Sequence, residues 1–105
     1  MIIVVLPFMK RRGMAIFPFV FFKHASGADE PVLVNHEKIH LQQQKELLVL
    51  PFYLFYLINY LYNLIQMLNH EQAYRSIIFE KEAYDHQSEV DYLQKRKPYS
   101  FIYYL

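Results

Sequence analysis

The chain has 105 residues, which is the size of one domain with a single hydrophobic core, and it is unusually apolar, with 54% hydrophobic and 18% aromatic residues. Its net charge of only +1 argues against nucleic acid as a partner. Because the chain contains no cysteine, disulfides and cysteine-ligated zinc sites are excluded.

Two short runs near the N-terminus predict β-strands. Residues 2–8 and 15–23 are rich in β-branched and aromatic side chains, and the polar segment 10–13 between them indicates a turn. Because a proline cannot donate to a strand ladder, Pro18 places the second strand at the edge of the sheet or at a bulge. An exposed edge could bind an extended peptide by strand addition, although the strands could equally do no more than cover the helices.

The motif that organises the chain lies in a predicted helix over residues 31–50, which begins with a proline after two acidic residues. Within it, His36, Glu37 and His40 have the H-E-x-x-H spacing of zinc-dependent hydrolases. Positions four apart lie one above the other on a helix, so the two imidazoles can bind one ion. Glu37 then lies about 100° around the helix, beside the ion, where a general base can take a proton from water.

Both histidines face the apolar stripe of this helix, where an unpaired imidazole would be costly to bury and a metal ion would satisfy it. The same spacing can also arise by chance on an amphipathic helix. The motif supplies only two of the three protein ligands that a catalytic zinc ion needs. A third ligand must therefore come from elsewhere in the chain.

Residues 47–68 contain no charged side chain, and a run of that length could span a membrane. Its proline, two asparagines, one glutamine and four tyrosines fit an amphipathic or interfacial helix better. We expect the run to pack on the strands, or to lie against a membrane or another copy of the chain. The first residues lack the features of a signal peptide, which predicts a cytoplasmic protein, with peripheral attachment to the inner membrane as the alternative.

A further helix is predicted over residues 76–95, ending before a proline. It offers two carboxylates near its start. Glu80 lies in the apolar stripe of this helix, where a buried carboxylate needs a cation, whereas Glu82 lies about 160° away and is expected to face solvent. Glu80 is therefore the candidate third ligand.

If Glu80 is to reach the histidines, the chain must reverse direction between about Leu50 and Asn63. A helix rises about 1.5 Å per residue, so a straight continuation would carry the chain too far away to return. We favour a reversal at Pro51, because the residue before a proline avoids helical angles.

H-E-x-x-H followed on a later helix by Glu80-x-x-Ala83 resembles the gluzincin metallopeptidases, and the short chain is most similar to the minigluzincins and to small bacterial proteins with the same two elements. The resemblance implies that His36, His40 and Glu80 bind Zn²⁺ and that Glu37 is the general base. Many gluzincins have an aspartate that supports a zinc-binding histidine where this chain has Tyr84. Tyr84 could instead hydrogen-bond a histidine or the substrate oxyanion, or only pack.

The predicted fold is α+β: one domain over residues 1–105, in which a short β-hairpin packs on three helices. The predicted function is zinc-dependent hydrolysis of a peptide or protein substrate, with no role for nucleic acid. The alternatives are a non-enzymatic membrane-associated protein built around residues 47–68 and a zinc-binding module without hydrolysis. The aromatic tail, residues 99–105, should cover the helices or the edge strand 17–22, or block the cleft as in latent minigluzincins.

Overall fold

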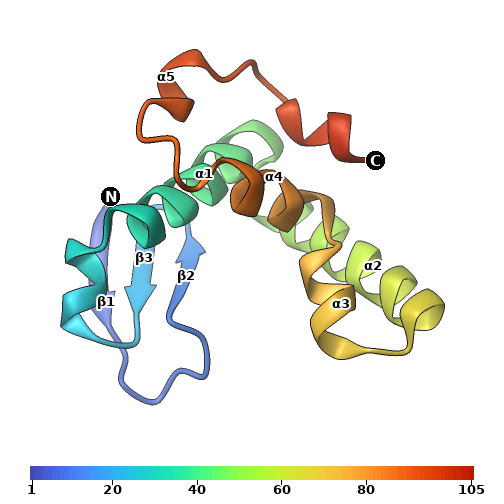
Figure 1. Ribbon diagram of the computed structural model, residues 1–105, viewed down its shortest axis with the longest axis horizontal. Helices are drawn as coiled ribbons and strands as arrows, with labels where there is room; N and C mark the ends of the chain where they lie inside the picture. The colour runs from blue at the N-terminus through green and yellow to red at the C-terminus, as the bar shows by residue number, and fades with distance from the viewer.

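The computed structural model describes residues 1–105 and has the predicted α+β fold (Figure 1). Three short strands form a sheet at the N-terminal end: β1 (Ile2–Val5), β2 (Gly13–Ile16) and β3 (Phe19–Phe22). The rest of the chain is helical: η1 (Ala25–Asp29), α1 (Pro31–Leu47), α2 (Val49–Met67), α3 (His70–Arg75), α4 (Ile78–His86), α5 (Tyr92–Lys95) and η2 (Ser100–Tyr104). Helix α1 lies between the sheet and the later helices.

The sheet differs from the predicted hairpin. The strand order is β1-β3-β2, with β1 parallel and β2 antiparallel to β3. The run 15–23 is not one strand, because it reverses at Phe17 and Pro18, where the missing N–H of proline removes no ladder bond. The side-chain oxygen of Gln44 accepts a hydrogen bond from the Phe17 N–H at 2.6 Å and holds this turn. The prediction that Pro18 and residues 17–22 lie at a sheet edge is therefore wrong, since β3 is central and β1 and β2 form the edges.

The reversal after α1 occurs earlier than predicted. Helix α1 ends at Leu47, and Leu48, with φ 65° and ψ 155°, turns the chain by 110° into α2. Pro51 does not break the chain, because it occupies the first turn of α2, where no backbone N–H has an intrahelical partner. The first backbone hydrogen bond of α2 runs from the Phe52 N–H to the Leu48 carbonyl at 3.0 Å.

The predicted helix 76–95 is two helices, α4 and α5, separated by a turn. The side-chain amide of Asn35 donates to the carbonyls of His86, Gln87 and Glu89 at 3.2, 2.9 and 2.8 Å. Carbonyls that point toward Asn35 are drawn away from the helix ladder, so the turn forms there. The structure also has a short helix, α3, that the analysis of the sequence did not predict. Its N-cap is Asn69, whose side chain accepts from the Gln72 N–H.

The C-terminal tail covers α4. It forms the 3₁₀ helix η2 instead of an extended segment, and Phe101 packs against Phe79 with ring centroids 5.0 Å apart, in a cluster with Phe52 and Ile77. Tyr104 donates a hydrogen bond to Asp85 at 2.7 Å. The tail therefore packs on helices, as one of the alternatives predicted, and it lies away from the β2 edge (Figure 1).

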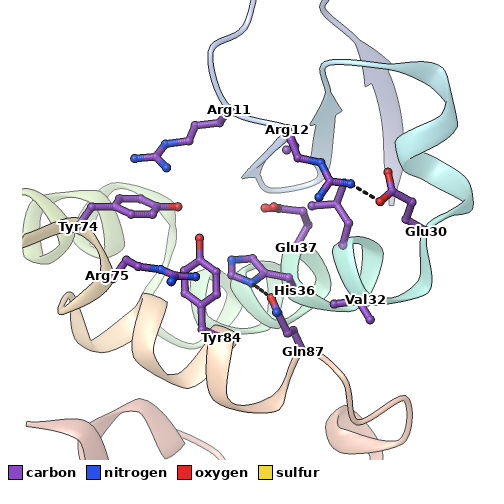
Figure 2. A pocket seen from close by; sticks show the side chains of 12 residues that line it. Arg11, Arg12, Glu30, Val32, His36, Glu37, Tyr74, Arg75, Tyr84 and Gln87 are labelled. Atoms are coloured by element: carbon purple, nitrogen blue, oxygen red, sulfur yellow. Dashed lines mark hydrogen bonds and ion pairs between the residues drawn. The ribbon is translucent and has the colours of Figure 1, made fainter. Parts of the chain in front are cut away.

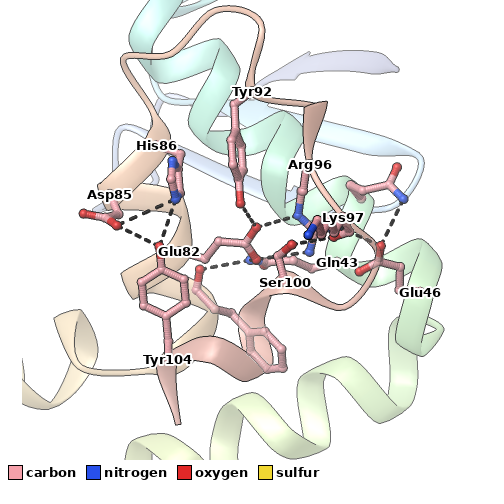
Figure 3. Close-up of polar contacts among 12 residues, drawn as sticks. Gln43, Glu46, Glu82, Asp85, His86, Tyr92, Arg96, Lys97, Ser100 and Tyr104 are labelled. Atoms are coloured by element: carbon pink, nitrogen blue, oxygen red, sulfur yellow. Dashed lines mark hydrogen bonds and ion pairs between the residues drawn. The ribbon is translucent and has the colours of Figure 1, made fainter. Parts of the chain in front are cut away.

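Glu82 is buried, so the prediction that it faces solvent is wrong. Its carboxylate accepts hydrogen bonds from Tyr92 at 2.5 Å, from the Arg96 guanidinium at 2.5 and 3.1 Å, and from Gln43 at 3.0 Å (Figure 3). Arg96 also donates to Glu46 at 2.7 Å. The reason for the error is that α4 buries two faces, one against α1 and one against the segment that contains α5 and η2. These contacts lower the pKa of Glu82 although burial opposes ionisation.

We expect Arg96→Met to lower the free energy of unfolding by about 3 kcal/mol, because it leaves the buried Glu82 carboxylate without its cation. The Arg96 side chain is only 2% exposed. Lys95→Met is the matched control, since that side chain is 56% exposed and should change stability by less than about 0.5 kcal/mol. Urea unfolding followed by circular dichroism measures both values, and equal small effects would contradict a structural role for the network.

Candidate metal centre and its cavity

Three buried side chains direct one ligand atom each toward a common point. The Nε2 atoms of His36 and His40 are 3.2 Å apart, and each lies 3.1 Å from Oε1 of Glu80. All three residues are at most 5% exposed. The histidines come from successive turns of α1, and Glu80 comes from the first turn of α4, which packs against α1. The structure thus brings together the three residues that the sequence analysis selected as metal ligands, and they could hold a metal ion.

Each of the three ligand side chains is oriented by one further residue. The Nδ1–H of His36 faces Oε1 of Gln87 at 2.9 Å, and the Nδ1–H of His40 faces Oε1 of Gln43 at 2.8 Å. Because an amide oxygen can only accept, these contacts place a proton on Nδ1 of each ring, so that Nε2 is the atom that can bind a metal ion when the ring is neutral. These are the supporting contacts that a metal-binding histidine normally has.

Glu80 is oriented in the same way. The hydroxyl group of Tyr56 donates to Oε2 of Glu80 at 2.6 Å, which leaves Oε1 directed at the histidines. Burial and the neighbouring Glu80 raise the pKa of Tyr56 far above its ordinary value, so the phenol stays protonated and remains a donor. A neutral donor at this position fixes the carboxylate without neutralising it.

The electrostatics of the three residues call for a cation. Burial alone would lower the pKa of His40, but contact with Glu80 raises that pKa to about 9. Burial would likewise raise the pKa of Glu80, but His40 and His36 hold it well below its ordinary value. In the chain alone, a proton on His40 therefore supplies the positive charge that the Glu80 carboxylate needs. A metal ion must displace this proton, so metal affinity should fall as the pH falls.

The geometry and the charge fit a divalent ion. Ligand atoms held about 2.05 Å from zinc at tetrahedral angles are about 3.3 Å apart, close to the 3.1–3.2 Å separations of this triangle. With neutral imidazoles, the carboxylates of Glu80 and Glu37 give the site a charge of −2, which a divalent ion neutralises. Two imidazoles and one carboxylate are ligand types that zinc accepts.

Glu37 follows His36 on α1 and points beside the triangle. It is 4% exposed, and its carboxylate accepts no hydrogen bond from the chain. Burial, as the largest cause, raises its pKa. The strand β2 leaves room for it at Gly13, where an added Cβ would stand only 2.8 Å from Oε2 of Glu37. A free carboxylate held beside the ligand triangle is the arrangement that a general base requires.

Two adjoining cavities meet at His36 and Glu37. The smaller, about 170 Å³, lies over the ligand triangle between β2 and α2. The larger, about 390 Å³, is lined by polar and charged side chains from α1, α3, α4 and the loop before β2 (Figure 2). The hydroxyl groups of Tyr74 and Tyr84 point into it opposite Glu37. No residue after Gln87 lines either cavity, so the C-terminal tail does not block them.

Tyr84 supports His36 through its ring. The two rings meet edge to face with centroids 4.6 Å apart, while Gln87 makes the hydrogen bond that an aspartate makes in many gluzincins. The roles of Gln87, Gln43, Tyr56 and Tyr74 were not predicted from the sequence. A signal existed for two of them, since an amide three residues after His40 lies on the apolar face of α1, and an amide seven residues after Glu80 lies on the Glu80 side of α4.

A search against protein-family models gives no match, and no curated protein and no solved structure matches the chain. The resemblance to gluzincins therefore depends on the motif residues, and the case for a metal site depends on the geometry of the three ligand atoms.

We expect Gln87→Leu to weaken zinc binding about 10- to 100-fold, because His36 would lose the acceptor that fixes its tautomer and orientation. The fold should be retained, since Gln87 makes no other side-chain hydrogen bond. Competition with a chromophoric chelator measures the affinity. Gln94→Leu, an exposed glutamine on α5, is the control. Unchanged affinity in Gln87→Leu would contradict the orienting role of Gln87.

Proposed function

We propose that the chain is a zinc-dependent peptidase in which His36, His40 and Glu80 bind the ion. The main support is the free, buried carboxylate of Glu37, which lies beside His36, His40 and Glu80. In each of these three side chains the second polar atom is hydrogen-bonded to another residue, which leaves one atom for the metal ion. A metal site that only stabilised the fold would be closed by a fourth ligand and would have no use for such a base. The two adjoining cavities give a substrate access to it.

A divalent ion bound there would act as a Lewis acid on the scissile carbonyl and on a water molecule. Glu37 takes the proton of the attacking water and passes it to the leaving amine, for which its raised pKa is suited, since a base with a very low pKa would hold the proton too weakly. The hydroxyl groups of Tyr84 and Tyr74 face Glu37 across the cavity and can donate to the negative charge that develops on the carbonyl oxygen (Figure 2).

The edge of β2 can bind an extended substrate over a short length only. β2 pairs with β3 on one side, and its other side borders the smaller cavity. The Ala15 carbonyl on that side is already occupied, because it accepts hydrogen bonds from Gln44 at 2.8 Å and from the Tyr53 hydroxyl group. The backbone groups of Gly13 therefore remain as the pairing site nearest Glu37.

We expect the purified protein to contain one zinc ion per chain and to hydrolyse peptides. The variants Glu37→Gln and Tyr84→Phe should both still bind the zinc ion. Hydrolysis should fall about 10²- to 10⁴-fold in Glu37→Gln, which loses the base, and about 10²- to 10³-fold in Tyr84→Phe, which loses an oxyanion donor. Metal analysis and cleavage of a random peptide library, read by mass spectrometry, measure these values.

Asp91→Asn and Tyr103→Phe are the controls, because both side chains are well exposed and outside the cavities. Iron in place of zinc would contradict the peptidase, since two histidines and one carboxylate also bind ferrous iron in oxygenases. Zinc without hydrolysis of any peptide would favour the binding-module alternative.

A second observation favours membrane association. The outer face of α2 is covered by large exposed apolar side chains: Leu50, Leu54, Phe55, Leu57, Ile58, Leu61, Tyr62 and Ile65. At 100° per residue they span about 160° of the helix circumference, wider than the seam that a single partner helix covers. No helix is by itself long and apolar enough to cross a bilayer, and α1 with α2 would qualify only as a pair bent by 110°. We infer that α2 lies flat on a lipid surface.

We expect the protein to float with vesicles of phosphatidylglycerol and phosphatidylethanolamine. Leu57→Glu combined with Ile58→Glu should reduce binding at least about tenfold, because two charges enter the apolar face. Gln94→Glu on α5 should have no effect. A wild-type protein that stays in the aqueous phase would overturn the proposal, and a dimer that the double substitution dissociates would show that a second copy covers this face.

A further inference from the structure

The larger cavity carries positive charge that the metal centre does not use. Three arginines line it: Arg11 and Arg12 from the loop before β2, and Arg75 from the end of α3 (Figure 2). The guanidinium of Arg12 is paired with Glu30 at the cavity edge. The one other carboxylate that lines the cavity is Glu37, which is the base in the proposed mechanism.

The other two arginines have little compensation from acidic groups. The nearest carboxylate oxygen to Arg11 belongs to Glu71 at 3.7 Å, beyond hydrogen-bond length and on a side chain that is 61% exposed. Arg75 has no carboxylate within ion-pair distance. Two guanidinium groups at the rim of one cavity, without close anionic partners, are available to an anionic ligand.

Both guanidinium groups are held in place by aromatic rings. The Cζ atom of Arg11 stands 3.8 Å from the centroid of the Tyr74 ring, and that of Arg75 stands 4.1 Å from the centroid of the Tyr84 ring. The hydroxyl groups of the same two tyrosines point into the cavity opposite Glu37. Stacking restricts each planar group while leaving its N–H donors free, which lowers the entropy cost of binding a carboxylate.

We propose that this cavity recognises a carboxylate of the substrate through Arg11 and Arg75, so that the peptidase prefers peptides with a carboxylate close to the scissile bond. The inference depends on the proposed function. A volume of about 390 Å³ is at the lower end of the range for small-ligand sites, about 300–1,000 Å³, which suits a terminal segment of a peptide more than a folded protein. The carboxylate can be the C-terminus of the peptide or the side chain of an aspartate or glutamate.

The experiment uses the best substrate found in the random library, synthesised in matched forms. One pair differs only in a free or an amidated C-terminus, and a second pair differs only in glutamate or glutamine beside the cleaved bond. We expect that in one of the two pairs the peptide with the carboxylate has the higher kcat/KM. The pair in which kcat/KM differs shows whether the recognised carboxylate is the C-terminus or the glutamate side chain. Arg75→Gln and Arg11→Gln should each lower kcat/KM for that form about 10- to 100-fold, mainly through KM, and lower kcat/KM for the neutral form much less.

Arg12→Gln is the matched control, because its guanidinium comes from the same loop and is occupied by Glu30, and it should change kcat/KM by no more than about twofold. Arg75→Lys keeps the charge but loses the planar group, and we expect an intermediate loss. Equal cleavage of charged and neutral forms by the wild type would overturn the carboxylate preference while leaving the peptidase intact.

A binding measurement separates the two proposals if no peptide is cleaved. Zinc-loaded Glu37→Gln protein is titrated calorimetrically with an acetylated penta-alanine peptide, once with a free C-terminus and once amidated, and with the same amidated peptide carrying one glutamate. Tighter binding of a carboxylate form that Arg75→Gln removes supports the recognition site without hydrolysis. The same weak affinity for all three peptides contradicts it.

Discussion

Two carboxylates, those of Glu37 and Glu80, are buried beside two imidazoles. The rest of the structure depends on how the negative charge of these buried carboxylates is compensated. An uncompensated buried carboxylate would destabilise a domain of this size by several kcal/mol. The chain compensates Glu80 with His40 and with the hydroxyl group of Tyr56, and it leaves Glu37 without a partner. A buried carboxylate without a partner is typical of sites where a ligand or a reaction uses the group, which points to a functional role for Glu37.

The site is stabilised from behind by residues that do not line it. Gln43 accepts from His40 with its oxygen and donates to Glu82 with its nitrogen, so one amide joins the ligand triangle to the buried pair of Glu82 and Arg96 (Figure 3). Helix α4 is thereby fixed on two faces, with Glu80 toward His36 and His40 and Glu82 toward the C-terminal segment. The C-terminal segment therefore supports the ligand geometry from a distance, without contact with the cavities.

The sequence predicts what depends on spacing within one helix and misses what depends on contacts between elements. The i, i+4 spacing placed His36 and His40 together, and the apolar stripe of the later helix selected Glu80 over Glu82 as the ligand. The same stripe argument failed for Glu82, because it assumes one buried face per helix. Asn35 donates hydrogen bonds to three backbone carbonyls at the end of α4, where Gln87 lies, and no local pattern encodes a contact between residues so far apart in the chain.

Helix α2 joins the two surfaces that the proposals concern. Its inner face carries Phe52, which is buried beside the ligand triangle, and Tyr56, which orients Glu80, whereas its outer face carries the exposed apolar stripe. These faces lie on opposite sides of the helix, since Tyr56 is about 240° around from Leu50 at 100° per residue. With the stripe on a lipid surface, the ligand triangle lies on the side of α2 away from the lipid. A substrate would then reach Glu37 from the aqueous phase, where a charged carboxylate can approach the two arginines without crossing apolar lipid.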